Sequence, residues 1–472
     1  MKIILSLAVS LCIASSGICQ FSTGDKTSPE EFEAILKSAN RATRDLADLP
    51  TSFSLKNFTP TPQNQGDNGT CVAWSSAYAA RTISLAIQRN ISTLDSINNY
   101  AFSPGYIYYK IKPATDSTCS SGASILTAMK TMTGNGAILK KEGIIDCIQN
   151  IPENVEKQKA TPYKIKDFLS LNESYGKFSK NDILKIKKSL TEKKPVVVSL
   201  KCFYSFTKVS ASGIWMPIED DEEMGGHAVC IIGYDDKMNK GGFEFLNSWG
   251  TEWGNKGFGW LSYEQLMKYG NYAVELMDFE AGKTEISGNI EFITLDEKIM
   301  PARRLKINSQ NITVHGKLKA DYSLYRLTDT IGSGGSFKMK FRTNAPCYIY
   351  IFAEDDKAVL SRLFPPKPAI SAAINSTNAT YYFPSDSTHA RLNPPAGKEN
   401  FCILYSKSEI DFEGLINYIR KSKVSILRGV KDKLATRLLD IKKVKFRDDK
   451  ITFQSPTEDK SVLCFFVEMN HK

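Results

Sequence analysis

The 472-residue chain contains only four histidines, and this scarcity narrows the search for its chemistry. His227 is the only histidine among the first 314 residues, so that part of the chain has one candidate for a histidine base. No Cys-x-x-Cys pair and no group of neighbouring histidines occurs in the sequence. We therefore expect no metal site, and nothing in the sequence indicates a cofactor.

Long apolar runs are also missing. Residues 3–14 form a run of 12 residues, whereas a membrane-spanning helix needs about 20. This run follows Lys2 and precedes small residues, which is the pattern of a secretory signal peptide over residues 1–19. We expect cleavage before Gln20 and export, either to a periplasm or out of the cell. A lipoprotein modified at Cys19 is the alternative.

No large block of one charge sign is present, and the net charge of +10 is spread along the chain. Two basic runs, residues 185–194 and 421–445, alternate with apolar residues at helical spacing, which is typical of solvated helix faces. We therefore expect neither nucleic-acid binding nor stable membrane insertion, although weak attraction to acidic polymers is compatible with the charge. The length and the 42% hydrophobic content predict a soluble protein of two or three domains.

Cys71 stands in a sequence context that suits a reactive thiol. An alanine-rich stretch, residues 72–81, predicts a helix after it, and residues 68–70 suit a turn and a helix cap before it. Cys71 is then expected at a helix N-terminus, where the macrodipole favours the thiolate, which is the reactive form. A nearby imidazolium would lower the thiol pKa further.

Two polar residues downstream are suited to act on this thiol. His227 precedes an apolar run, residues 228–232, that predicts a buried strand. We expect its imidazole at the edge of that strand, close to solvent. Asn247 ends a second apolar run and would orient the imidazole through its side-chain amide, while Trp249 would shield this hydrogen bond from water.

Gln65 lies six residues before Cys71 and adds a side-chain N–H donor. With the backbone N–H of Cys71 it would form an oxyanion hole, in which one donor is typically worth about 3–4 kcal/mol of barrier. Each residue also has an ordinary explanation, since most isolated cysteines are buried and most isolated histidines are structural. The order Cys71, His227, Asn247, with separations of 156 and 20 residues, favours thiol chemistry over these explanations.

These segments resemble the papain family of cysteine peptidases over roughly residues 49–279. The matching motifs are Asn64-Gln65-Gly66, Cys71 with Ser75, Gly226-His227-Ala228 with Gly233-Tyr234, and Asn247-Ser248-Trp249-Gly250 with Trp253-Gly254. The resemblance implies an α+β, two-lobed papain-like fold, with a helical lobe, a β-barrel-like lobe and a substrate cleft between them.

The same resemblance implies a role for each candidate residue. Cys71 is the nucleophile, His227 the acid and base, and Asn247 the residue that orients the imidazole. Gln65 stabilises the oxyanion. The implied activity is a cysteine-type peptidase that hydrolyses peptide bonds of protein or peptide substrates through a thioester acyl-enzyme.

The sequence also departs from the family pattern. Val72 replaces an aromatic residue after the nucleophile, and Asn68 replaces a cysteine that starts a family disulfide. The glycine pair that borders the family's specificity pocket is unclear, with residues 120–122 as the nearest candidate. The short extension before the peptidase domain resembles that of bacterial members, and it leaves the control of activity open.

Eight cysteines remain after the expected cleavage. Cys119 and Cys147 flank a predicted helical segment and are our preferred disulfide pair, because an oxidising compartment permits disulfides. Cys202 and Cys230 lie in apolar runs and are predicted to be buried thiols. Three more cysteines, for which core packing and bridging are both open, are Cys347, Cys402 and Cys464.

We predict four segments along the chain. They are a signal peptide (1–19), a short N-terminal extension (20–48) with a helical pattern over residues 28–46, a papain-like peptidase domain (49–279) and a β-rich C-terminal accessory domain (280–472). Three segments of the last domain, 344–352, 363–365 and 401–406, resemble in that order an uncharacterised β-rich domain of unknown function that follows some bacterial papain-like peptidases. The last domain would serve as a stability or spacer module, or bind a surface, a polymer or a protein partner.

Alternating and apolar runs predict five strands in this last domain, at residues 337–341, 348–352, 401–405, 444–446 and 462–467. An amphipathic helix is predicted at residues 412–419. A stretch rich in proline, serine and asparagine, residues 365–380, predicts a long surface loop.

Two other functions fit the same residues. A catalytically silent papain-like protein would bind peptides or partners in the cleft. A related thiol acyl-transferase would form the same acyl-enzyme and pass it to an amine instead of water. The sequence leaves the cleavage preference and the physiological substrate open.

Overall fold

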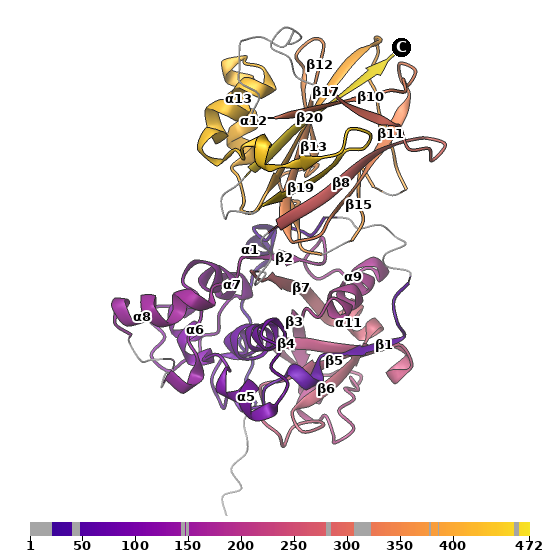
Figure 1. The fold of residues 1–472 in the computed structure, drawn as a ribbon. Helices are drawn as coiled ribbons and strands as arrows, with labels where there is room; N and C mark the ends of the chain where they lie inside the picture. The colour runs from indigo at the N-terminus through magenta and orange to yellow at the C-terminus, as the bar shows by residue number, and fades with distance from the viewer. Residues whose placement is uncertain are drawn as a thin grey trace, which may run out of the picture.

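The computed structural model describes residues 21–39, 48–142, 147, 151–279, 285–305, 322–376, 379–385, 387–456 and 462–472. The expected signal peptide and residues 40–46 of the expected helical pattern lie outside these residues. Figure 1 shows two regions stacked on each other, with α1 (Pro29–Glu33) and β2 (Asp167–Ser170) at their junction. We refer to them as the N-terminal region (up to residue 279) and the C-terminal region (from residue 285).

The first part of the N-terminal region is helical. Cys71 begins one long helix built from α3 (Cys71–Ala73), the π-helical η2 (Trp74–Arg81) and α4 (Thr82–Gln88), so the predicted helix is confirmed. Thr70 occupies the N-cap position without a side-chain capping bond. The remaining helices of this lobe are α5 (Leu94–Asn99), α6 (Pro104–Ile111), α7 (Ile125–Gly134) and α8 (Glu153–Ala160).

The second part is an antiparallel sheet with the strand order β2-β7-β3-β4-β5-β6, and β1 pairs with β4. The described strands run from one open edge to the other, so this lobe is an open sheet and not the barrel-like lobe that we expected. Its other strands are β1 (Ser52–Ser54), β3 (Val196–Phe203), β4 (Glu223–Asp235), β5 (Gly242–Leu246), β6 (Phe258–Ser262) and β7 (Gly270–Met277). Its helices are α9 (Lys180–Thr191), α10 (Tyr204–Thr207) and α11 (Tyr263–Tyr269).

The C-terminal region is β-rich, as predicted, and contains two sheets. Their orders are β13-β12-β17-β20-β10-β9 and β15-β11-β8-β19-β18, with β14 on β12 and β16 on β11. The strands are β8 (Glu285–Thr294), β9 (Ala302–Leu305), β10 (Ser323–Leu327), β11 (Ser336–Thr343), β12 (Cys347–Asp355), β13 (Leu360–Phe364), β14 (Ala373–Ile374), β15 (Tyr381–Phe383), β16 (Ala390–Arg391), β17 (Gly397–Ser406), β18 (Lys445–Phe446), β19 (Thr452–Pro456) and β20 (Val462–His471). The helices are α12 (Phe412–Ser422) and α13 (Ile426–Leu434).

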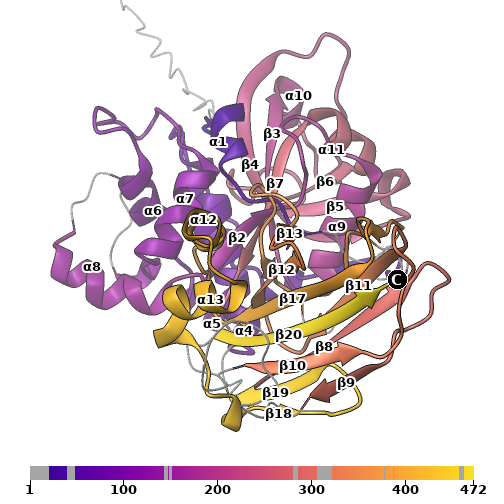
Figure 2. The same cartoon turned by 90° about the horizontal axis from the view of Figure 1, so that it is seen from above.

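Strand alternation explains how one sheet serves two cores, because successive side chains point to opposite faces. In β12, Ile349 and Ile351 join the core that the two sheets share. Tyr348 and Tyr350 face the other way, where α12 and α13 cover the sheet, and the Tyr350 ring lies 4.9 Å from that of Phe412. Figure 2 shows these helices beside the sheet that holds β17 and β20.

In its described part, the predicted surface loop at residues 365–380 is exposed only at residues 366–369. The prediction is wrong for residues 371–376, which are buried and include β14. Asn375 donates a hydrogen bond of 2.5 Å to the buried Glu275 of β7. Small and apolar residues inside this polar stretch pack in the interface between the two regions. The overall polar composition of the stretch did not indicate this burial.

Among the described residues, no helix is both long enough and apolar enough to cross a membrane.

Candidate active site

The fold brings Cys71 and His227 together. Cys71 begins α3 in the helical lobe, and His227 lies within β4 of the sheet lobe, opposite Leu200 of β3. The backbone N–H of Ala228, the residue after His227, lies near the Cys71 sulfur, where it opposes the rise in thiol pKa that burial causes. Both side chains are fully buried. The expected position of the imidazole close to solvent is therefore wrong, because β4 begins at Glu223 and other side chains cover the ring.

Asn247 holds the imidazole of His227. The ring Nε2 and the Asn247 Oδ1 are 2.8 Å apart. The Trp249 ring lies against the imidazole, with centroids 4.7 Å apart, and Phe206 packs edge-on at 5.8 Å. This position fits the shielding role predicted for Trp249. The other ring nitrogen, Nδ1, is buried and has no hydrogen-bond partner among the described residues.

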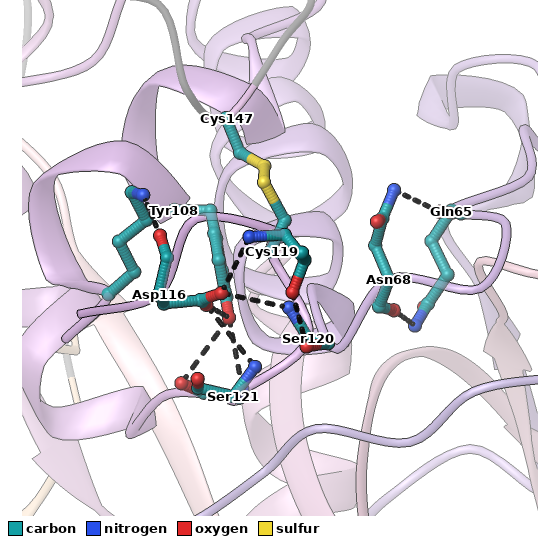
Figure 3. The surroundings of a disulfide bond; sticks show 11 residues. Gln65, Asn68, Tyr108, Asp116, Cys119, Ser120, Ser121 and Cys147 are labelled. Carbon is teal, nitrogen blue, oxygen red and sulfur yellow. Dashed lines mark hydrogen bonds between the residues drawn. A yellow bond between two sulfur atoms is a disulfide. The ribbon is translucent and has the colours of Figure 1, made fainter. Parts of the chain in front are cut away.

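The Gln65 side chain is fixed by hydrogen bonds at both ends. Its Oε1 accepts a bond of 2.5 Å from Ser248 Oγ, and its Nε2 donates to the carbonyl oxygen of Asn68 at 2.7 Å. Figure 3 shows Gln65 and Asn68 bonded to each other. The same Nε2 donates to the carbonyl oxygen of Ser22 at 3.0 Å. The Gln65 Nε2 group, which was predicted to bind the oxyanion, therefore already donates to two carbonyl oxygens. One of them, the carbonyl of Ser22, comes from the start of the described chain.

Residues 21–39, here called the N-terminal segment, cover the Cys71 thiol. The N–H groups of Gly24 and Asp25 donate to the carbonyl of Gly226 at 3.1 and 3.0 Å, on the sheet lobe. On the helical lobe, Ala123 N–H donates to Gly24 at 2.8 Å. The Gly24 N–H also lies near the Cys71 sulfur, where it opposes the rise in thiol pKa that burial causes. The segment thus lies as a strand between the two lobes, directly over the thiol.

This arrangement requires glycine at position 24. A Cβ atom there would lie 2.1 Å from the carbonyl oxygen of Gly69, far inside the contact distance. Gly122 has a φ of 78°, and a Cβ atom there would lie 2.5 Å from the Gly24 carbonyl oxygen. Residues 120–122, the nearest sequence candidate for the specificity border, are thus part of the wall against which the segment lies.

Aromatic stacking fixes the beginning of the segment. The Phe21 ring stacks on Trp249, with centroids 4.8 Å apart, and Trp249 Nε1 donates to the Ser22 carbonyl at 3.1 Å. Sequence analysis treated these residues only as a polar extension. The pair Gly24-Asp25 is too common a sequence pattern to have predicted that these residues cover the thiol.

Burial controls the charge state of the site. Burial, together with the nearby Asp25 carboxylate, raises the pKa of the Cys71 thiol to about 12. Burial also lowers the pKa of His227 to about 4, against the opposing effect of the hydrogen bond that the imidazole donates to Asn247 Oδ1. The expected lowering of the thiol pKa is therefore wrong for this covered state. At neutral pH the site holds a neutral thiol and a neutral imidazole.

The predicted disulfide between Cys119 and Cys147 is confirmed (Figure 3). It closes the loop that supplies Ala123 to the site. Asp116 supports this loop, since its carboxylate accepts the Tyr108 hydroxyl at 2.8 Å and the N–H groups of residues 118, 120 and 121. Sequence analysis did not find this support.

The other cysteines of the N-terminal region, Cys202 and Cys230, are buried free thiols, as predicted. In the C-terminal region, the Cys402 and Cys464 sulfurs lie 3.9 Å apart without a covalent bond. Within the part of the chain that the structure describes, no group of three or more His, Cys, Asp or Glu side chains is arranged to hold a metal ion.

A thiol at the start of a helix, placed against a histidine–asparagine pair on an antiparallel sheet, is the arrangement of a papain-like thiol enzyme. The sequence agrees, because residues 49–275 match the family described as papain family cysteine protease. Residues 331–409 match a domain of unknown function (DUF4384). The chain therefore contains a papain-family cysteine protease domain followed by a DUF4384 domain.

Individual relatives each cover part of the chain. An uncharacterised peptidase C1-like protein of Acanthamoeba polyphaga mimivirus is 28% identical over 225 residues, which is 45% of this chain and 69% of the viral protein. Cathepsin K of Mus musculus is 22% identical over 30% of this chain and 51% of its own length. Among solved structures, xylellain, a cysteine protease from Xylella fastidiosa, is 22% identical over 55% of this chain and 96% of its own, with a TM-score of 0.45.

Proposed function

We infer that this protein is a cysteine peptidase that hydrolyses peptide bonds with Cys71 as nucleophile. The observation that carries this is the 2.8 Å contact between His227 Nε2 and Asn247 Oδ1 beside the Cys71 thiol. A base held by an orienting partner and placed beside a thiol at a helix N-terminus is the geometry that thiol catalysis needs.

In the proposed reaction the Cys71 sulfur attacks the carbonyl carbon of the scissile bond after His227 Nδ1 takes the thiol proton. The imidazolium then gives that proton to the leaving amine, and a thioester remains on Cys71. Water, deprotonated by the imidazole, attacks the thioester and releases the acid, which restores the thiol. Asn247 keeps Nε2 bonded, so that Nδ1 stays directed to the reacting atoms.

The carbonyl of Ser22 supports the role of Gln65. This carbonyl belongs to an extended strand that crosses the thiol, and it accepts bonds from Gln65 Nε2 and Trp249 Nε1. A substrate carbonyl in an equivalent position would present its developing oxyanion to Gln65 Nε2 and to the backbone N–H of Cys71. The N-terminal segment must leave this position before a substrate can enter.

Export is part of the proposal. The disulfide between Cys119 and Cys147 supports folding in an oxidising compartment, either a periplasm or the outside of the cell. We place the peptidase domain at residues 49–279 and the accessory domain at residues 280–472. Protein or peptide chains are the proposed substrates.

The test uses an epoxide inhibitor selective for papain-like thiolates, with mass spectrometry of the adduct. The variant Gly24→Ala displaces the segment, because its Cβ would meet Gly69. We expect one adduct, on Cys71, that forms much faster in Gly24→Ala than in the parent and disappears when His227→Ala is added. Gly134→Ala is the matched control, since a Cβ there meets no atom within 4 Å.

Hydrolysis of a peptide library by Gly24→Ala, lost in Gly24→Ala/Cys71→Ala, would complete the case. An open site that forms no adduct under reducing conditions would instead indicate a catalytically silent binding protein. If products carry an added amine in place of water, the protein is an acyl-transferase of the same mechanism.

A further inference from the structure

We propose that the C-terminal region is the anchor of the N-terminal segment, so that this region determines whether Cys71 is covered. The anchoring contact is made by residues 36–39 of the N-terminal segment, which bind residues 369–371 of the C-terminal region. It rests on the proposed function, because covering Cys71 controls activity only if Cys71 is the nucleophile.

The first observation is a strand with partners on both sides. Lys37 N–H donates to the carbonyl of Ala369 at 2.9 Å, and Ser371 N–H donates to the carbonyl of Lys37 at 2.9 Å. On the other side, Ser38 N–H donates to Ser170 at 2.8 Å, and Ser170 N–H donates to Leu36 at 2.9 Å. The backbone of residues 36–38 therefore joins the edge strand β2 of the N-terminal region to residues 369–371 of the C-terminal region.

The second observation is the burial of the side chains next to this strand. Ala39 is 5% exposed and belongs to the core that the two C-terminal sheets share. Leu36 packs against an apolar cluster that contains Leu169 of the N-terminal region and Tyr348 of the C-terminal region. The downstream end of the segment is therefore built into the C-terminal region and not laid on its surface.

Lys37 has a strongly constrained side chain. It is 4% exposed, and its Nζ donates to the Phe32 carbonyl at 2.9 Å and lies 4.0 Å from the centre of the Phe32 ring. Glu33 lies 3.4 Å from the same Nζ. These contacts tie the anchor strand to α1, so a displacement of Lys37 is transmitted to the helix that precedes it.

The anchor (residues 36–39) lies close along the chain to residues 21–27, here called the covering strand, which lie over the thiol. Lys37 is 12 residues after Asp25, and α1 with its Ser28–Glu31 capping box occupies part of that distance. A tether this short holds the covering strand near the thiol at an effective concentration in the millimolar range. The covering strand itself is held by four backbone hydrogen bonds to Gly226 and Ala123. The side-chain bonds to the Ser22 carbonyl and the stacking of Phe21 on Trp249 add to these, and all of them act within the reach that the tether sets. Loss of the anchor should therefore open the site.

The test compares two substitutions of the same residue type in the full chain. Ala39→Arg places a charged side chain in the C-terminal core, whereas Ala34→Arg changes an exposed position of the same segment. The readouts are amide hydrogen exchange of residues 21–27 and the rate of iodoacetamide alkylation of Cys71, both followed by mass spectrometry. We expect both rates to rise about tenfold or more in Ala39→Arg. Neither should change in Ala34→Arg.

A second variant covers the case in which Ala39→Arg unfolds the C-terminal region, which exchange in β17 and β20 would reveal. Lys37→Pro removes the N–H that bonds Ala369, together with the Lys37 Nζ contacts to Phe32 and Glu33, and it changes no side chain of the C-terminal core. We expect the same opening over residues 21–27.

The result that overturns the proposal is exchange that rises at residues 36–38 while residues 21–27 and Cys71 stay protected. That result would leave the peptidase function untouched. Conversely, an opened and alkylated Cys71 without hydrolysis would contradict the peptidase function and leave the anchor in place.

Discussion

The Cys71 thiol has two obstacles to reaction in the covered state, one steric and one electrostatic. The backbone of Gly24 lies over the sulfur, and the Asp25 carboxylate stands nearby. With a pKa raised to about 12, roughly one thiol in 10⁵ is ionised at neutral pH. Displacement of the segment removes both obstacles together, because it returns water to the sulfur and takes the carboxylate away.

His227 and Asn247 have unequal roles, and their variants should show it. In the Gly24→Ala background, His227→Ala should lower kcat by about 10²–10⁴-fold, since it removes the group that transfers the proton. Asn247→Ala should cost less, because the histidine keeps its basicity and loses only the bond at Nε2. Peptide hydrolysis by both variants gives the comparison. Equal losses would mean that orientation of the ring matters as much as the ring itself.

The buried imidazole predicts a dependence of stability on pH. The pKa of His227 is about 4 in the folded protein and about 6.5 when unfolded. Between these values the unfolded chain binds a proton that the native protein does not, so stability is retained above pH 6.5 and falls as the pH drops towards 4. The slope is about 1.4 kcal/mol per pH unit.

Urea unfolding at pH 7 and pH 5 measures this effect against the variant His227→Gln. All five tryptophans lie between residues 74 and 260, so their fluorescence reports the N-terminal region alone. The wild type should lose about 2 kcal/mol more than the variant. Asp25, whose pKa burial raises, contributes with the opposite sign but is present in both proteins. Equal losses would contradict a buried neutral His227.

Among the elements, the short loop from Asp116 to Ala123 forms the binding surface for the N-terminal segment on the helical lobe. It supplies the N–H and the carbonyl of Ala123 that bind the N-terminal segment. Two features hold it, the disulfide from Cys119 and the hydrogen bonds to the Asp116 carboxylate. A wall without secondary structure of its own is thereby made rigid.

Removal of the disulfide should therefore destabilise the N-terminal region. Cys119 and Cys147 are separated by 28 residues, and closing a loop of that length is worth about 3–4 kcal/mol in the chain-entropy account. We expect this loss in the variant Cys119→Ser/Cys147→Ser, measured by urea unfolding. Reduced wild-type protein separates the loss of the cross-link from the effect of the serines. A loss below about 1 kcal/mol would show that Asp116 alone holds the loop.

At the scale of the whole molecule, the two regions share a polar and partly buried interface. Asn375 binds Glu275, the Tyr348 hydroxyl donates to Asp167 at 2.9 Å, and Ser376 binds Glu192 at 2.6 Å. The carboxyl group of Glu275 is 1% exposed. Such a group is stable in the interior only while it keeps its hydrogen-bond partners.

This buried pair gives a prediction for the interface. Asn375→Leu leaves Glu275 without its nearest partner and should cost about 3 kcal/mol of stability, in the range found when a buried polar pair is broken. The double variant Glu275→Leu/Asn375→Leu should recover most of this loss, because it leaves no unpaired polar group. Thermal unfolding of the three proteins measures the coupling. No recovery in the double variant would show that the hydrogen bond matters less than the packing.

Particular residues show what could be predicted from sequence. Cys71 at a helix start, the Cys119–Cys147 bridge and the helix from Phe412 depended on local patterns or on chain order, and the structure has all three. The solvent-near imidazole of His227 was wrong, and so was the surface position of residues 371–376. Both depended on contacts with segments distant in the chain.

The amino-acid sequence by itself determined which residues are available for the proposed chemistry. The proposed thiol nucleophile, histidine base and orienting amide occur in motifs whose order is a property of the chain. Only the tertiary structure decided the state of that chemistry. It placed Gly24 and Asp25 over Cys71 and built Ala39 into the C-terminal core. The physical reason is that burial and electrostatic environment arise from long-range packing, which local sequence patterns do not encode.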